Sequence, residues 1–138
     1  MNRDSSTAGF TLVEILVVIT ILSIMSALAA PVLKRPPSQT RLKADAARMA
    51  AAIRVTRAAA MAQNRPIDFV IDLKRPSYGS PVVPLSPMDP ATIVATKSRE
   101  IRFFPSGQST GSDIRLRLEQ AEARLQVIWA TGHVVLDE

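Results

Sequence analysis

GFTLVEI, residues 9–15, opens a run of 19 residues without a charge, ILVVITILSIMSALAAPVL at positions 15–33. As a helix this run spans roughly 28 Å, which is close to the hydrocarbon thickness of a bilayer. We therefore predict a membrane helix over residues 10–33. Proline removes a backbone donor and crowds the preceding turn, so Pro31 is expected to kink the last turns of this helix.

Glu14 is the one acid in residues 10–33. A carboxylate carried to the middle of a membrane costs on the order of 2.5–3.5 kcal/mol, so an acid at the start of a membrane helix needs a reason. One interpretation is that Glu14 lies solvated in the headgroup layer. The other is that a cation meets it, as buried charges generally require.

These residues resemble the class III signal of type IV pilins and type II secretion pseudopilins: a short polar leader ending in glycine, then Phe-Thr-Leu-Val-Glu, then an apolar helix. The resemblance implies that a prepilin peptidase removes a leader of residues 1–9. The cut then falls between Gly9 and Phe10, and Phe10 becomes the N-methylated first residue. It also implies that Glu14 pairs with the N-terminal amine of a neighbouring subunit during fibre assembly.

Two other interpretations of the N-terminus remain open. In a secretory signal peptide, Ala27-Leu28-Ala29 would be the cleavage site, but the apolar run is long for that class and Glu14 interrupts its start. In a plain anchor, Lys34 and Arg35 would place the following chain in the cytoplasm by the positive-inside rule. The resemblance implies the opposite orientation, which we adopt: one pass through the inner membrane, with residues 34–138 as a periplasmic domain.

The composition limits the chemistry of the chain. Its 138 residues suffice for an anchor and one modest domain, and the absence of cysteine excludes disulfides, thiol catalysis and cysteine metal sites. Beyond Leu33 there are 16 lysines and arginines against 10 acids, because only Arg3, Asp4 and Glu14 precede that point. This excess of positive charge fits either an anionic partner or a solvated surface.

A second helix is predicted over residues 39–64. The adjacent Pro36 and Pro37 disfavour helix before them, so we expect a break or bend there, where the resembled family has one long helix. The second helix is alanine-rich and ends before Arg65-Pro66, with Asn64 as a cap. One narrow arc holds its apolar residues Leu42, Ala46, Met49, Ile53 and Ala60.

The remaining chain reads as strands. Residues 67–73 alternate between apolar and polar, which places Asp68 and Asp72 on a solvent face as solubilising acids. The five prolines of residues 76–90 predict a loop. A short strand is possible at 92–95, and residues 100–104 and 113–118 are predicted to pair as a hairpin around the turn at 105–111.

A second resemblance covers the end of the chain. Residues 103–111, FFPSGQSTG, are similar to a hairpin of H-type minor pseudopilins, and residues 125–136 fit their final hairpin, with Thr131-Gly132 at its turn. His133 is predicted to be a surface residue, and Trp129 to fill the core or an interface.

Together these features predict an α+β, pilin-like fold: a long N-terminal membrane helix followed by an antiparallel β-sheet packed on its C-terminal half. The sequence has no nucleophile–base set, metal cluster or cofactor loop, so we predict no catalytic residues, no metal, no cofactor and no small-molecule substrate.

The function that the resemblance implies is that of an H-type minor pseudopilin in the type II secretion pseudopilus, which helps export folded proteins across the outer membrane. Its partners would be the major pseudopilin, other minor pseudopilins and the prepilin peptidase. The alternative is a minor pilin of a type IV pilus that binds DNA through a basic patch, with affinity falling steeply as salt rises. The acidic ending of residues 135–138 argues against a nucleic-acid partner. A secreted soluble binding protein is the third and weakest candidate.

Overall fold

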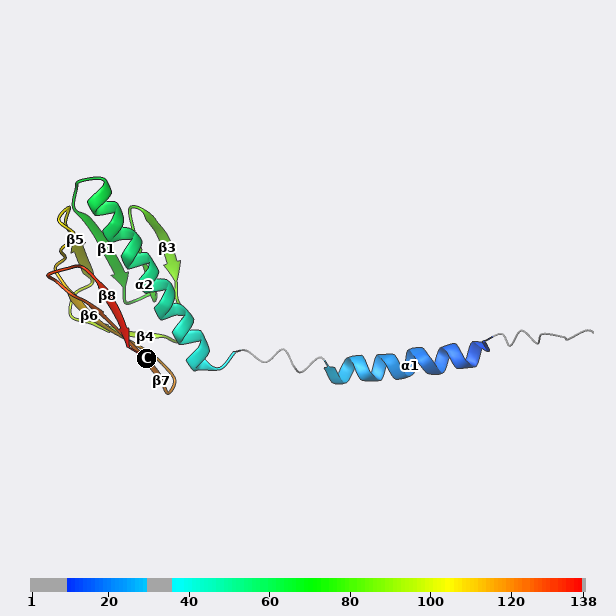
Figure 1. The fold of residues 1–138 in the computed structure, drawn as a ribbon. Coiled ribbons are helices and arrows are strands. Elements are labelled where there is room, and N and C mark those ends of the chain that lie inside the picture. The colour runs from blue at the N-terminus through cyan, green and yellow to red at the C-terminus, as the bar shows by residue number, and fades with distance from the viewer. Residues whose placement is uncertain (1–9, 30–35, 138) are drawn as a thin grey trace, which may run out of the picture. The chain divides into compact units, whose positions relative to one another are not determined.

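The computed structural model describes residues 10–29 and 36–137, which fall into two compact units divided between Arg35 and Pro36 (Figure 1). In the first unit, α1 runs from Leu12–Ala29. The predicted leader of residues 1–9, the cleavage residue Gly9 and the predicted kink at Pro31 lie outside the described residues.

The second unit begins with α2, Ser38–Ala62, which confirms the helix predicted at 39–64 to within two residues. Pro37 precedes it in an extended conformation, with φ −49° and ψ 147°, so the helix starts directly after the second proline. The path between Ala29 and Pro36 is not described, and the predicted break stays a prediction.

The helix ends one residue before the predicted cap, because its C-cap is Gln63 and Asn64 is the residue after it. Asn64 adopts φ +48°, and its N–H donates to the carbonyl of Met61 at 3.4 Å while the N–H of Arg65 donates to that of Ala60 at 3.3 Å. These two bonds, from the two residues after the C-cap Gln63, satisfy carbonyls that the helix end would leave free. Pro66 follows and cannot continue the helix.

The strands in the described part of the chain form two four-stranded antiparallel sheets. Sheet A has the order β3-β2-β1-β5, and sheet B the order β4-β6-β7-β8. The strands of sheet A are β1 (Ile67–Asp72), β2 (Ser77–Ser80), β3 (Val83–Pro87) and β5 (Glu100–Phe103). Those of sheet B are β4 (Ile93–Thr96), β6 (Ser112–Leu118), β7 (Ala121–Val127) and β8 (Val134–Asp137).

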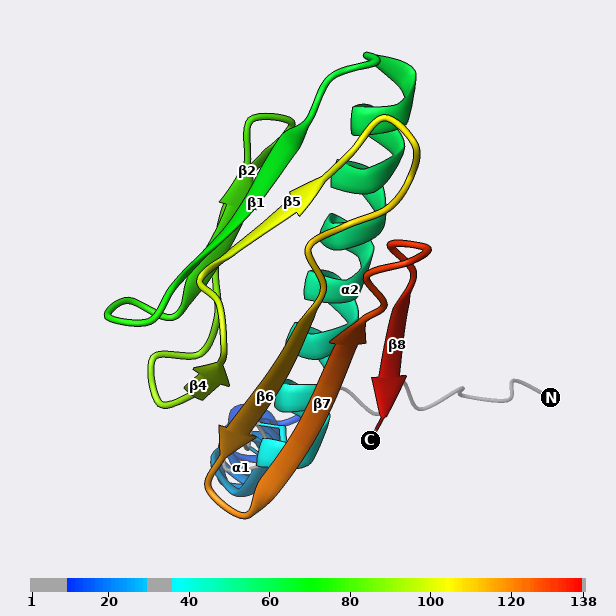
Figure 2. The ribbon, with the colours of Figure 1, turned by 90° about the vertical axis from the view of Figure 1, so that its left-hand side faces the viewer.

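Both sheets pack on α2, which contacts strands of each (Figure 2). The predicted apolar arc of α2 is the helix face that they cover, and all of its members are buried: Leu42, Ala46, Met49, Ile53 and Ala60. The inward residues of the strands alternate as a half-buried sheet requires, for example Ile114, Leu116 and Leu118 on β6. The predicted α+β architecture is therefore confirmed, with two sheets in place of the single one expected.

The loop predicted at residues 76–90 is wrong in its main part, because β2 and β3 form a hairpin there. The prolines are tolerated because β3 is the outer strand of sheet A, where one row of N–H groups is not needed for pairing. The hairpin contributes Tyr78 to the core, where its ring stacks on Phe69 with centroids 5.8 Å apart. Burial raises the pKa of the Tyr78 phenol.

The hairpin predicted between residues 100–104 and 113–118 is also wrong. β5 pairs with β1 in sheet A, whereas β6 pairs with β4 and β7 in sheet B. The chain does turn back at first, since Thr110 N–H donates to the Arg102 carbonyl at 3.0 Å. Gly111 then adopts φ +71°, and the chain crosses to the other sheet. By contrast, the predicted final hairpin is confirmed, with β7 paired to β8.

Candidate assembly site

The first candidate segment is the start of α1, which the local sequence builds as a capped helix. Thr11 lies just before the helix, and its Oγ1 accepts a hydrogen bond from the backbone N–H of Glu14 at 3.2 Å. Threonine at the N-cap with glutamate three residues later is the sequence pattern of a capping box, but only the Thr11 half of it forms among the described residues. An acid in the first turn is also favoured by the helix dipole. Glu14 thus has a structural use in addition to the predicted pairing.

Phe10 and Glu14 are both exposed, and 77% of the Phe10 surface is accessible. Among the described residues, the Glu14 carboxylate has no hydrogen-bond or ion-pair partner. The N-terminal end of α1 therefore presents an exposed aromatic residue and an unpaired acid, four positions apart in the sequence.

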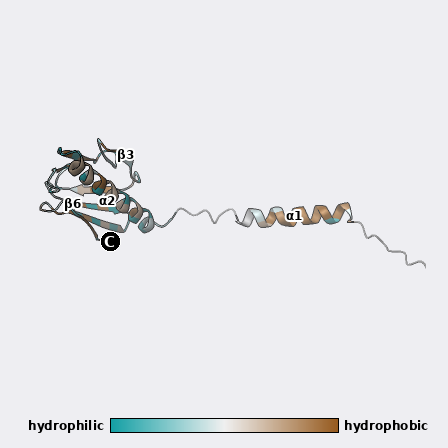
Figure 3. Cartoon of the chain, turned by 45° about the horizontal axis from the view of Figure 1, so that its top comes forward, coloured by the Kyte–Doolittle hydropathy of each residue, from teal (hydrophilic) through white to brown (hydrophobic). Residues whose placement is uncertain are grey.

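The surface of α1 is apolar on every side (Figure 3). Two of its hydroxyls are satisfied within the helix: that of Thr20 donates to the Leu16 carbonyl at 2.6 Å, and that of Ser23 donates to the Ile19 carbonyl at 2.7 Å. A helix that is hydrophobic all round is normally covered by lipid or by other helices. In the described structure the large apolar side chains of α1 are exposed, including Leu12, Ile15, Val18, Leu22 and Met25.

Over the residues that the structure describes, neither helix has the length and apolarity required of a membrane span. The membrane helix predicted at 10–33 extends past the described end of α1, because residues 30–33 lie outside the described range.

Asp68 and Asp72, the two acids predicted on the solvent face of residues 67–73, both make contacts with neighbouring residues. Asp68 accepts two bonds from the guanidinium of Arg102, at 2.7 and 2.9 Å, and this hydrogen bonding lowers the pKa of the carboxyl. Asp72 accepts the backbone N–H groups of Lys74 and Arg75 at 2.8 and 3.3 Å, which lowers its pKa as well. Both carboxylates therefore hold local structure at the surface of the sheet.

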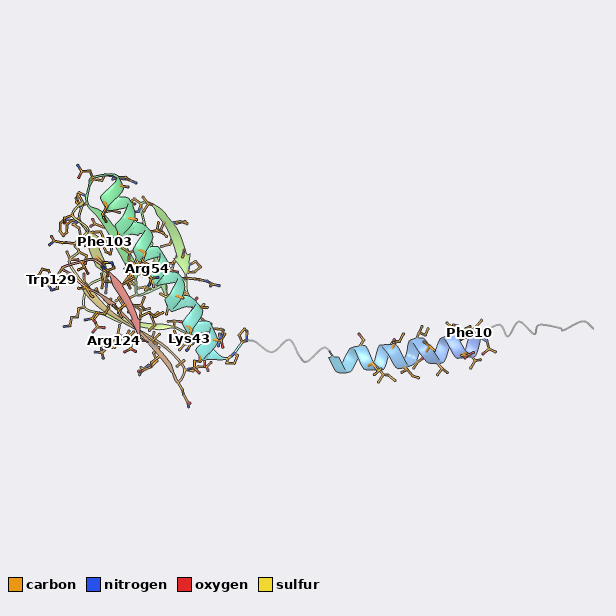
Figure 4. The ribbon with its side chains drawn as sticks, in the orientation of Figure 1. Phe10, Lys43, Arg54, Phe103, Arg124 and Trp129 are labelled. Atoms are coloured by element: carbon orange, nitrogen blue, oxygen red, sulfur yellow. The ribbon has the colours of Figure 1, made fainter. Side chains whose placement is uncertain are left out.

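The sole histidine of the sequence, His133, is exposed at the final turn, as predicted, and its backbone N–H donates to Thr131 Oγ1 at 3.3 Å. Within residues 10–29 and 36–137 there is no group of three or more His, Asp or Glu side chains placed to hold a metal. Trp129 is 67% exposed, so its predicted place in the core is wrong, and its place in an interface stays a prediction (Figure 4).

Arg57 is a residue that the sequence reasoning missed. Its Nε–H donates to the carbonyls of Gly107 and Thr131, at 3.0 and 2.9 Å, and so ties α2 to two turns that are distant in sequence. Both turns belong to motifs that the sequence singled out. The available signal was position: Arg57 lies four residues after Ile53 and three before Ala60, half-buried at the edge of the buried arc of the helix.

Family comparisons agree with this arrangement. Residues 4–30 match the prokaryotic N-terminal methylation motif, and residues 45–132 match the family model of the type II transport protein GspH. The type II secretion system protein H of Xanthomonas campestris pv. campestris is 32% identical over 136 residues, which cover 91% of this chain and 80% of that protein.

Two groups of solved structures share the fold. The minor pseudopilin EpsH of the type 2 secretion system of Vibrio cholerae aligns with a TM-score of 0.59 at 11% identity, over 70% of this chain and 96% of its own. The type IV minor pilin FimU of Pseudomonas aeruginosa aligns with a TM-score of 0.57 at 17% identity, over 70% of this chain and 93% of its own. At these identities the likeness establishes the fold.

Proposed function

The chain belongs to the family of the type II transport protein GspH, and on this premise we propose that it is a minor pseudopilin subunit of the type II secretion pseudopilus. In this role it helps the export of folded proteins across the outer membrane. Its partners are the major pseudopilin and the other minor pseudopilins, beside which it packs in the fibre.

The observation that carries the proposal is that α1 exposes apolar side chains around its whole circumference. Such a helix needs an apolar environment on all sides, which either lipid or a bundle of like helices supplies. On assembly α1 moves from lipid into a bundle of like helices, and both surroundings are apolar. The β-sheets and α2 stay outside that bundle as a folded domain.

We propose that the prepilin peptidase cuts between Gly9 and Phe10 and that Phe10 is N-methylated. The match to the methylation motif over residues 4–30 supports this assignment. Glu14 is then the acid that pairs with the N-terminal amine of a neighbouring subunit. Its unpaired carboxylate in the first turn of α1 supports that role, and its position fixes the register of one helix against the next.

Before assembly, residues 10–33 cross the inner membrane once, and residues 34–138 form the periplasmic domain. The uncharged run of the sequence supports this proposal, because it continues to Leu33, four residues beyond the described end of α1. The division of the chain into two compact units between Arg35 and Pro36 supports a boundary close to the proposed one.

The chain acts as a structural component, in keeping with its family, and is a substrate of the peptidase and not itself an enzyme. Asp68 and Asp72 support this view, because their carboxylates are engaged in contacts that hold the sheet and its turn. We propose that the protein uses no metal, cofactor or small-molecule substrate.

A minor pilin of a type IV pilus is the second candidate, and the TM-score of 0.57 to FimU against 0.59 to EpsH shows that the fold alone does not separate the two. The family model and the 32% identical relative favour type II secretion.

Cysteine cross-linking in cells tests the proposal directly, because the chain has no native cysteine. Val17→Cys in α1 should form a disulfide with a cysteine placed at the same helix position of the major pseudopilin when the secretion system is intact. A matched variant, Ala51→Cys on the exposed face of α2, controls for random collision. Cross-linking of Val17→Cys to a type IV major pilin, with none to the major pseudopilin, would instead support the second candidate.

A further inference from the structure

The outer face of sheet B places like charges directly opposite one another. In the register of β6 and β7, Arg115 pairs with Arg124, although like charges in such positions destabilise a sheet. The other cross-strand partners on this face carry opposite charge, with Glu122 across from Arg117 and Asp137 across from Arg124, so Arg115 is the arginine that has a like charge and no acid directly opposite on β7. The Arg115–Arg124 pair therefore leaves a local excess of positive charge on this face, to which an external anion could bind.

Neighbouring acids neutralise only part of this charge. Arg124 is held by Asp113, with contacts of 3.0 and 2.5 Å, and this hydrogen bonding lowers the pKa of the Asp113 carboxyl (Figure 4 labels Arg124). The guanidiniums of Arg115 and Arg117 make no hydrogen bond or salt bridge within the described residues, and both side chains are exposed. Both guanidiniums thus face solvent with an acid nearby, Asp113 for Arg115 and Glu122 for Arg117, but without a direct hydrogen bond to it.

A groove runs past these arginines. It has a volume of about 540 Å³, and its lining includes Ile93, Ala95, Arg115, Arg117, Arg124 and Asp137. The floor is low on the β4 side because Ala95, which lies beside Arg115 in the register, has a short side chain. Next to it, Ile93 lies beside Arg117 and is 57% exposed, which adds an apolar contact.

We propose that this groove binds an extended acidic segment of a partner protein, whose carboxylates at alternate positions are received by Arg115 and Arg117. These arginines are two residues apart on a strand, so their Cα atoms are separated by about 6.6 Å, which is also the spacing of alternate residues in an extended peptide. Each guanidinium can bind a carboxylate through two parallel hydrogen bonds. The residue between the two acids of the ligand faces away from the groove floor.

The lining of the groove favours a peptide over a nucleic acid. It contains no aromatic side chain on which a base could stack, and Glu122 and Asp137 would repel a continuous row of phosphates. A peptide with two acids and neutral residues elsewhere avoids most of this repulsion and gains contact with Ile93.

Binding is measured by fluorescence anisotropy with the full chain in neutral detergent and a short labelled peptide of alternating threonine and glutamate. Exchange of both arginines for glutamine (R115Q with R117Q) should weaken binding by about fivefold to tenfold. The matched control, R54Q with R99Q, removes the same charge from two exposed arginines outside the groove and should change the affinity by less than about twofold.

A second variant, Ala95→Trp, fills the groove floor without a change in charge and should also weaken binding. A peptide with glutamine in place of glutamate should not bind, and binding of the glutamate peptide should weaken as ionic strength rises. The proposal is overturned if the two arginine pairs weaken binding equally, if the glutamine peptide binds as well, or if the full chain does not bind the glutamate peptide. Tighter binding of an oligothymidylate of equal charge, lost in R115Q with R117Q, would overturn it in favour of a nucleic acid.

Discussion

A Cβ atom on Gly132 would lie 2.3 Å from the carbonyl oxygen of Gly107, so the turn that contains Gly107 and the turn that contains Gly132 are in backbone contact. Gly132 also has φ +64°, a conformation that side chains disfavour. Gly132→Ala should therefore lower the free energy of unfolding by roughly 3 kcal/mol, measured by urea denaturation with circular dichroism.

Gly107→Ala is the matched control for that change. Its φ is +85°, but the three atoms nearest to the added Cβ belong to side chains and not to the backbone, with Arg57 at 3.1 Å and Met61 at 3.3 Å. It should cost about 1–2 kcal/mol from backbone strain alone. Equal losses in the two variants would show that contact between the turns is unimportant.

Arg57 should hold the same two turns against α2. Arg57→Ala removes the donor to the carbonyls of Gly107 and Thr131 and should cost about 2 kcal/mol of unfolding free energy in the same assay. Arg54→Ala, one turn earlier and exposed, should cost less than about 0.5 kcal/mol. If the two losses prove alike, the contribution of the Arg57 bonds is negligible.

The ion pairs of the two sheets should make stability sensitive to acid. Hydrogen bonds from Arg102 and Arg124 lower the pKa of Asp68 and Asp113, respectively, below the ordinary value of 3.8. A lowered pKa in the folded state contributes stability above the unfolded value and loses it as the pH falls through the folded one. The melting temperature should therefore drop steeply below about pH 4.

Exchange of both carboxyls, as D68N with D113N, tests the source of that acid sensitivity. The double variant should melt lower than the natural chain at pH 7 and lose less on acidification. A parallel decline of both proteins below pH 4 would assign the acid sensitivity to other groups.

Glu14 offers a test that separates pairing from capping. Glu14→Gln removes the charge but keeps a residue suited to the third position of the helix. It should leave cleavage intact and reduce the amount recovered with isolated pseudopili by at least about tenfold, because a buried amine would lose its partner. Thr11→Ala removes the capping oxygen and keeps the acid, and it should assemble almost normally. The opposite ranking of these two variants would mean that Glu14 acts through the helix start alone.

The sequence predicted those elements whose signals are local. The end of α2 could be read from Asn64 and Pro66, and its buried arc from the spacing of residues such as Met49 and Ile53, because a helix face repeats within the element itself. The alternation of β1 was equally readable, since its period of two is set by one buried face.

Strand pairing and edges were not readable in the same way. The prolines of β3 indicate a loop unless it is known that β3 is an edge strand, which is a property of the whole sheet. The partner of β5 is β1, some 30 residues earlier, and in that pairing Ile101 and Phe103 are buried, but a partner so distant in sequence leaves no local pattern.

The candidate site was predicted only through a motif. Phe10 and Glu14 could be identified from the sequence motif that surrounds them. Arg57 has no local sequence signature, so its role became visible only in the three-dimensional structure. Arg115 and Arg124 are unremarkable in the sequence, and their opposition appears only once the register of β6 and β7 is known.

The central claim is that a trimmed, apolar N-terminal helix makes this chain a fibre subunit, and the mass of the mature N-terminus tests it most directly. Protein purified from its native membrane should begin at Phe10 and carry one methyl group on its amine, and Gly9→Leu should leave the leader of residues 1–9 in place. A mature chain that begins at Met1, or at Ala30 after cleavage behind Ala27-Leu28-Ala29, would contradict the account.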